Sequence, residues 1–93
     1  MDDNKSNILL VDDDLEFYLL LQTVLQSSSK SKIINLIHSP DIQTAKEIIR
    51  EETYLAYIID GYLPDGNGIE FIRWIKEELK DHPPIAFVSN GYK

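Results

Sequence analysis

The 93-residue sequence contains no cysteine, which excludes disulfide bonds, thiolate metal sites and a cysteine nucleophile. It also has only four glycines and four prolines, and 43% of its residues are hydrophobic against 27% charged. This composition is typical of a folded, globular chain rather than a disordered one. The length suits one domain with a small hydrophobic core.

Basic residues are also scarce, with nine Lys and Arg against sixteen Asp and Glu, for a net charge of −7. Sequence-independent binding to nucleic acid and binding to anionic membranes both depend on clustered cations, so neither is expected. The residues before the first apolar run are acidic, and that run covers only residues 8–11. Neither a signal peptide nor a membrane span is predicted there, and we expect a cytoplasmic protein.

Four short apolar runs are separated by three longer segments in which apolar residues recur with helical spacing. An apolar run without polar alternation is typical of a strand buried on both faces, as in a parallel sheet. The order β-α-β-α-β-α-β requires crossover connections and predicts an α/β fold with a parallel sheet. The predicted strands are residues 8–11, 32–38, 54–59 and 85–88.

Capping residues mark the expected starts of the three helices. Asp13 or Asp14 is expected to cap the first helix and Asn67 the third. Ser39 is expected to cap the second helix, with Pro40 at its first helical position. The face of the first helix that packs on the sheet is predicted to consist of Phe17, Leu20, Leu21 and Val24.

Polar side chains follow three of the predicted strands. Asp12, Asp13 and Asp14 follow the first, Asp60 ends the third, and Ser89 follows the fourth. Open parallel sheets bind ligands at the carboxyl ends of their strands. If the first and third strands are neighbours, the carboxylates of Asp12, Asp13 and Asp60 converge there. Because like charges repel, such a cluster favours a bound cation, and hard oxygen ligands favour Mg²⁺.

Asp60 has a second possible role as a carboxylate nucleophile that forms an aspartyl phosphate. Phosphoryl transfer depends mainly on positioning and charge neutralisation, and Ser89 could supply a hydroxyl donor. The alternative is structural: the run 12–14 taken alone is more typical of helix capping, and Asp60 could be a turn residue. The combination of acids after two strands with a hydroxyl after another favours the phosphoryl site.

Three segments resemble the receiver domains of response regulators. Residues 8–14 (ILLVDDD) are similar to the apolar strand and acidic pair that open this family. Residues 60–68 (DGYLPDGNG) resemble the segment that follows its phosphoaccepting aspartate, and residues 84–89 (PIAFVS) resemble its fourth strand with a terminal Ser or Thr. The resemblance covers essentially the whole chain. It implies a flavodoxin-like (CheY-like), doubly wound parallel sheet.

The resemblance also implies specific roles in a two-component phosphorelay. Asp60 would be the phosphoacceptor, and Asp12 and Asp13 would bind Mg²⁺ together with it. The backbone carbonyl of Tyr62 would be a further ligand of the ion. Ser89 would contact the phosphoryl group and switch with it. The donor would be a phosphohistidine on a histidine kinase or phosphotransfer protein.

The sequence departs from this family at its C-terminal side. The family has five βα units, whereas residues 1–93 are interpreted as one receiver domain truncated after the fourth strand. The lysine and the aromatic residue of the fifth strand have no counterpart, since Lys93 lies only four residues beyond Ser89. We therefore expect slow phosphotransfer or an uncoupled switch, or else a degenerate receiver that acts as a protein-interaction module. No enzymatic activity is expected, and Tyr62 disfavours a haloacid dehalogenase-type phosphatase, which needs an aspartate at this position.

An incomplete sheet would leave the fourth strand as an edge, and exposed edges pair readily with other chains. The first helix also has more apolar residues than one packed face needs. We therefore expect the chain to self-associate, to exchange elements or to dock on a partner. The apolar residues outside the predicted core face are Leu15, Tyr18, Leu19 and Leu25.

Overall fold

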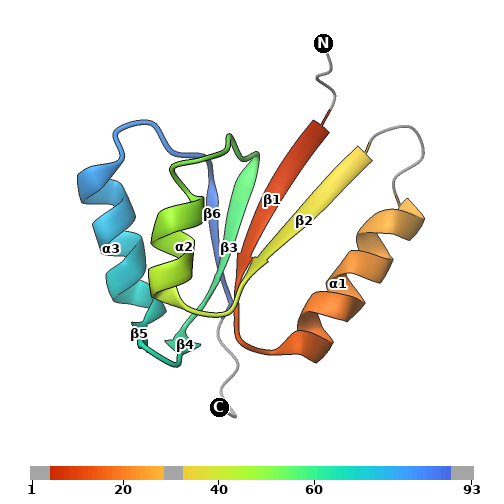
Figure 1. Cartoon of the computed structure of the whole chain (residues 1–93), viewed down its shortest axis with the longest axis horizontal. Coiled ribbons are helices and arrows are strands. Elements are labelled where there is room, and N and C mark those ends of the chain that lie inside the picture. The colour runs from red at the N-terminus through yellow and green to blue at the C-terminus, as the bar shows by residue number, and fades with distance from the viewer. Residues whose placement is uncertain (1–4, 29–32, 89–93) are drawn as a thin grey trace.

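The computed structural model describes residues 5–28 and 33–88, which form a parallel four-stranded sheet with three helices (Figure 1). The strand order is β2-β1-β3-β6, and a separate two-stranded hairpin, β4-β5, follows β3. The expected α/β architecture with a parallel sheet is confirmed, and the strand order of the main sheet follows the flavodoxin-like pattern. The strands are β1 (Lys5–Val11), β2 (Ile33–Ser39), β3 (Ala56–Asp60), β4 (Tyr62–Leu63), β5 (Gly66–Asn67) and β6 (Ile85–Val88), and the helices are α1 (Leu15–Ser28), α2 (Ile42–Ile48) and α3 (Gly68–Glu78).

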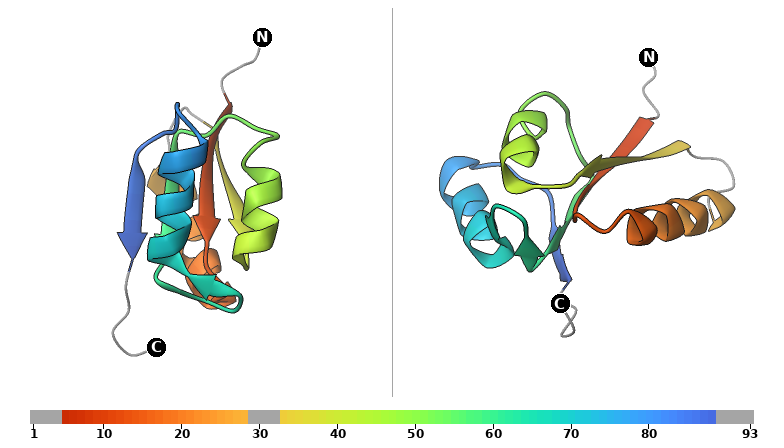
Figure 2. Two further views of the ribbon diagram at one scale, coloured as in Figure 1. Left: turned by 90° about the vertical axis from the view of Figure 1, so that its left-hand side faces the viewer. Right: turned by 60° about the horizontal axis from the view of Figure 1, so that its bottom comes forward.

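The helices lie on both faces of the sheet. Figure 2 shows α2 and α3 on one face and α1 on the other. The central strand β1 is buried on both faces, since Leu9, Leu10 and Val11 have no exposed surface. This explains why its sequence is solidly apolar instead of alternating. None of the helices in the described residues is long and apolar enough to cross a membrane.

The main hydrophobic core lies between the sheet and the α2–α3 layer. Leu9 and Val11 of β1 point to this face, because side chains alternate along a strand. Phe71 and Ile75 of α3 pack against them one helical turn apart. The buried cluster consists of Leu9, Val11, Ala45, Ile49, Tyr54, Tyr57, Ile59, Phe71 and Ile75.

The prediction for the packed face of α1 was partly wrong. Phe17 and Leu21 are half-buried, as expected of core-facing residues, but Leu20 and Val24 are 61% and 49% exposed. Tyr18, which was predicted to lie outside the core face, is half-buried and its ring stacks on a histidine of β2. No side chain of residues 15–27 is fully buried, so α1 covers its face of the sheet only loosely.

The prediction for the start of α2 was also wrong. Ser39 belongs to β2, because its carbonyl accepts the backbone N–H of Asp12 at 3.0 Å. The helix begins after Pro40 and Asp41, and Asp41 is its N-cap, with its carboxylate accepting the N–H of Thr44 at 2.8 Å. The extension of β2 by pairing with β1 therefore moves the cap by two residues.

Two other helix starts agree with the sequence. Asp14 caps α1, and Asn67 caps α3 with its side-chain oxygen. The segment between β3 and α3 contains the β4–β5 hairpin, which was not among the predicted strands. Local sequence therefore specified the caps where no long-range strand pairing competed with them.

A pair of leucine substitutions tests this difference between the two faces. Leu9→Ala is expected to lower the free energy of unfolding by about 3 kcal/mol, because it leaves a cavity in the packed core. In the monomeric chain, Leu20→Ala should change it by less than about 0.5 kcal/mol, since that side chain is largely in solvent. Urea unfolding monitored by circular dichroism measures both. A loss at Leu20 comparable with that at Leu9 would contradict the observed packing of α1.

Candidate functional site

The side chains of Asp12, Asp13 and Asp60 meet at one end of the sheet. β1 and β3 are adjacent and parallel, with Val11 paired to Ile59, so the residues that follow them lie together. Each of the three carboxylates offers an oxygen, and these oxygens lie within 4.8 Å of one another. Asp12 and Asp60 are buried, at 3% and 1% exposure, whereas Asp13 is exposed. The convergence expected from the sequence is therefore present.

The backbone of Asp12 is held from both sides. Its N–H donates to the carbonyl of Ser39, and its own carbonyl lies 2.6 Å from Nε2 of His38. Its carboxylate Oδ1 accepts the N–H of Asp14 at 2.9 Å. The His38 ring also stacks on Tyr18 of α1, with the ring centroids 4.7 Å apart. Asp12 is thus tied to β2 and to the start of α1.

The three aspartates that follow β1 have different roles. Asp14 caps α1, because its Oδ1 accepts the N–H groups of Glu16 and Phe17 at 3.0 and 3.2 Å. The capping alternative is therefore correct for Asp14. Asp12 and Asp13 are the members of the run that lie in the carboxylate cluster.

The chain after Asp60 folds back onto it. The N–H of Gly61 donates to the carbonyl of Val88 on β6, and the N–H of Gly68 donates to the carbonyl of Gly61, both at 3.0 Å. A Cβ atom at Gly68 would lie 2.0 Å from the carbonyl oxygen of Asp60. Only glycine fits there, so the loop begins and ends at the buried aspartate.

Asp65 connects this loop to α2, and sequence reasoning did not identify it. Its Oδ1 accepts the N–H of Ile42 at 2.9 Å, and its Oδ2 accepts the N–H of Gln43 at 3.0 Å. The hydrogen bond from Ile42, supported by that from Gln43, holds the pKa of Asp65 below its usual value. No local signal could have revealed this contact, because it joins segments more than twenty residues apart.

A cleft of 460 Å³ opens beside the carboxylate cluster and is lined by Asp13, Asp14, Tyr62, Leu63 and Pro64. The Tyr62 side chain is 56% exposed, and its backbone pairs with β5. The predicted site residue Ser89 lies outside the described residues.

The chemistry of the cluster fits a small divalent cation. Oxygens on opposite sides of an octahedral Mg²⁺ lie about 4.2 Å apart, so three oxygens within 4.8 Å need only small side-chain movements to share one ion. An all-oxygen donor set is the type that Mg²⁺ prefers. The exposed carboxylate of Asp13 leaves the cluster open to solvent on one side. The residues present therefore match the ion implied by the sequence.

Comparison with known proteins gives a consistent result. The model of the family described as response regulator receiver domain matches residues 8–93. Among curated proteins, the transcriptional regulatory protein GltR of Pseudomonas aeruginosa is 40% identical over 80 residues. That match covers 86% of this chain but only 31% of GltR, so the chain spans less than a third of this relative.

Solved structures show the same fold. The MaeR response regulator bound to beryllium trifluoride superposes with a TM-score of 0.79 at 24% identity, over 90% of this chain and 66% of that chain. The non-phosphorylated HemR receiver domain from Leptospira biflexa gives a TM-score of 0.75 at 27% identity, over 90% and 64%. The chain thus spans a little under two thirds of these structures.

Neutralising one carboxylate of the cluster should raise the stability of the fold without metal and weaken its stabilisation by Mg²⁺. Without Mg²⁺, Asp13→Asn is expected to raise the free energy of unfolding by about 1 kcal/mol, because it removes one of three mutually repelling charges. With Mg²⁺ present, the ion should stabilise the wild type more than the variant, since binding to the folded state adds to stability. Thermal melts over a Mg²⁺ series measure both effects. Equal Mg²⁺ stabilisation of the two proteins would contradict a role for Asp13 in binding.

Proposed function

Because the chain belongs to the response regulator receiver family, we propose that Asp60 accepts a phosphoryl group in two-component signalling, with Mg²⁺ bound beside it. The proposal rests on the convergence of the carboxylates of Asp12, Asp13 and Asp60 within 4.8 Å at the ends of two adjacent strands. The proposed donor is a phosphohistidine on a histidine kinase or phosphotransfer protein.

In this proposal Asp12, Asp13 and Asp60 hold the ion, and the backbone carbonyl of Tyr62 is a further ligand. Mg²⁺ at this position would neutralise the carboxylates and the charge of the incoming phosphoryl oxygens. Tyr62 is supported as a ligand because it begins β4, two residues after Asp60, and lines the same cleft as Asp13.

Asp60 has the chemistry and the placement of a nucleophile. One carboxylate oxygen attacks phosphorus, and the O–P bond forms as the P–N bond to the donor imidazole breaks. The imidazole nitrogen keeps the electron pair of that bond and takes up a proton.

Ser89 is included in the proposal as the hydroxyl that contacts the phosphoryl group. Val88 pairs with Asp60 in the sheet, and its carbonyl accepts the N–H of Gly61 at 3.0 Å. The described end of β6 therefore lies beside the phosphoacceptor, and the next residue in the sequence is Ser89. This placement of Val88 supports the role inferred from the sequence.

Small-molecule phosphorylation tests the proposal without requiring a cognate kinase. Acetyl phosphate with Mg²⁺ is expected to add the mass of one phosphoryl group to the wild type and none to Asp60→Asn, because only the carboxylate is nucleophilic. Intact-mass spectrometry measures the addition. Chelation of Mg²⁺ should reduce it strongly. Asp41→Asn, which alters a helix-capping carboxylate away from the cluster, is the matched control and should be phosphorylated normally.

The phosphoacceptor proposal is wrong if the wild type behaves like Asp60→Asn with both acetyl phosphate and beryllofluoride. That result would favour the alternative function, in which the chain is a degenerate receiver that binds a partner protein without phosphotransfer.

A second function, protein–protein association, is favoured by the apolar surface of α1. Four of its large apolar side chains are exposed, and exposed apolar surface of this kind is available for contacts with another protein. In the described sheet β6 is an outer strand, and Phe87 on it is 44% exposed. We propose that the 93-residue chain self-associates through α1 and the β6 edge. The exposed large apolar residues of α1 are Leu15, Leu19, Leu20 and Val24.

Light scattering after size-exclusion chromatography tests this association. At micromolar concentrations the wild type is expected to elute as a dimer or larger species, and Leu20→Lys should shift it towards the monomer by placing a charge in the contact. Leu55→Lys is the matched control, since Leu55 is similarly exposed but lies outside α1 and β6. A monomeric wild type, or an equal effect of both substitutions, would exclude this interface.

A further inference from the structure

We propose that Asp65 is a positioning residue for the metal site: by bonding to the start of α2, it holds the β4–β5 hairpin and thereby the Tyr62 carbonyl in place. This inference rests on the proposed function, because it concerns the same Mg²⁺ site. The two hydrogen bonds from the N–H groups of Ile42 and Gln43 to the carboxylate of Asp65 are here called the Asp65 clasp.

The hairpin is attached to the sheet at its base. Gly68 packs against the carbonyl of Asp60, and its N–H donates to Gly61. Within the hairpin, Tyr62 pairs with Asn67. These contacts fix where the hairpin leaves and rejoins the sheet, but they leave its tip without support.

Burial contributes little to holding the tip. Residues 64–67 are all exposed, and only Leu63 of the hairpin packs, partly buried, against the hydrophobic core. A two-stranded hairpin of this size is not stable alone. Its orientation therefore depends on polar contacts with a neighbouring element.

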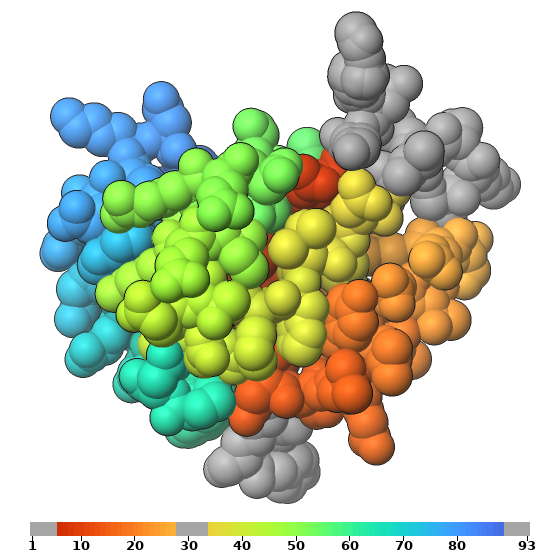
Figure 3. Space-filling model, in the orientation of Figure 1, coloured from red at the N-terminus to blue at the C-terminus, as the bar shows by residue number. Residues whose placement is uncertain are grey.

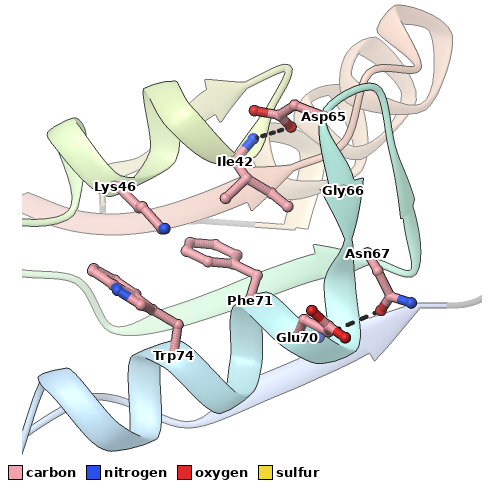
Figure 4. A pocket seen from close by; sticks show the side chains of 8 residues that line it. All are labelled: Ile42, Lys46, Asp65, Gly66, Asn67, Glu70, Phe71 and Trp74. Atoms are coloured by element: carbon pink, nitrogen blue, oxygen red, sulfur yellow. Dashed lines mark hydrogen bonds between the residues drawn. The ribbon is translucent and has the colours of Figure 1, made fainter.

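The Asp65 clasp supplies such a contact. Both carboxylate oxygens accept backbone N–H groups, at 2.9 and 3.0 Å, and hydrogen bonds to a charged acceptor are stronger than neutral ones. Gly66 lies so close to α2 that a Cβ atom there would be 2.8 Å from Cδ1 of Ile42. Figure 4 shows the hydrogen bond between Asp65 and the backbone N–H of Ile42 at the start of α2. Figure 3 shows the hairpin lying against the start of α2.

The clasp supports the hairpin more than it supports the helix. α2 already has an N-cap, since the carboxylate of Asp41 accepts the N–H of Thr44 at 2.8 Å. Asp65 is thus a second acid at the same helix start, but it comes from the loop that carries Tyr62. Its loss leaves the helix capped, and the hairpin is then held by its base and by the packing of Leu63 without a hydrogen bond to α2.

Two alanine variants, Asp65→Ala and Asp41→Ala, separate a role in positioning the metal site from a role in capping α2. Each removes one carboxylate from the start of α2, but only Asp65→Ala releases the hairpin. Residue-resolved NMR titration with Mg²⁺ alone measures the dissociation constant of each protein, and the spectra report whether each is folded. Thermal melting gives the accompanying loss of stability. The matched control is Asp41→Ala.

Asp65→Ala is expected to raise the Mg²⁺ dissociation constant about 10-fold, which is the size typical of residues that orient metal ligands. Asp41→Ala should leave it unchanged while lowering the melting temperature. Asp65→Asn should give an intermediate constant, because an amide oxygen can accept one of the two N–H groups and the amide nitrogen cannot accept the other. If Asp65→Ala does not fold, the comparison of Asp65→Asn with Asp41→Asn decides in the same way.

The outcomes distinguish this inference from the proposed function. If the wild type binds Mg²⁺ and the variants at positions 65 and 41 have equal dissociation constants, the positioning role is overturned and the metal site stands. If the wild type shows no Mg²⁺-dependent shifts at residues 12, 13 and 60, the metal part of the proposed function fails and the inference fails with it.

Discussion

The parallel pairing of β1 with β3 forces three carboxylates together, and the organisation around the site follows from that constraint. Two of these side chains are buried, where like charges repel strongly in the absence of a cation. The surrounding backbone is correspondingly well anchored. Asp12 is held by Ser39, and Gly68 lies against Asp60 with no space for a side chain. The contacts at this end of the sheet therefore hold together carboxylates that repel one another and that favour a bound metal ion.

The two faces of the sheet differ in how completely they are covered. The α2–α3 face contains the tightly packed core, and the hairpin that follows Asp60 is bonded to this layer through the Asp65 clasp. The α1 face is loosely packed, with exposed apolar side chains on the helix. The hairpin beside the carboxylate cluster is thus bonded to the well-packed layer, whereas α1 carries exposed apolar surface.

Much of the fold could be read from local patterns. Solid apolar runs identified the buried strands, and Asp14 and Asn67 were recognisable as helix caps because each acts on N–H groups two or three residues away. The acids after β1 and β3 could be placed together because carboxyl ends of neighbouring parallel strands share one edge. The α1 face was predicted less well, since apolar residues surround most of that helix and periodicity alone could not select which side packs.

The sequence by itself determined the three helices and the four strands of the main sheet, their order and the chemical identity of the clustered acids, because these depend on neighbouring residues and on general rules of parallel sheets. Only the tertiary structure decided that Ser39 belongs to a strand, that His38 contacts the carbonyl of Asp12 and that Asp65 binds the start of α2. Each of these contacts joins segments more than twenty residues apart. Their partners are selected by the folded geometry, and a hydrogen bond across such a separation leaves no periodic or local trace in the chain.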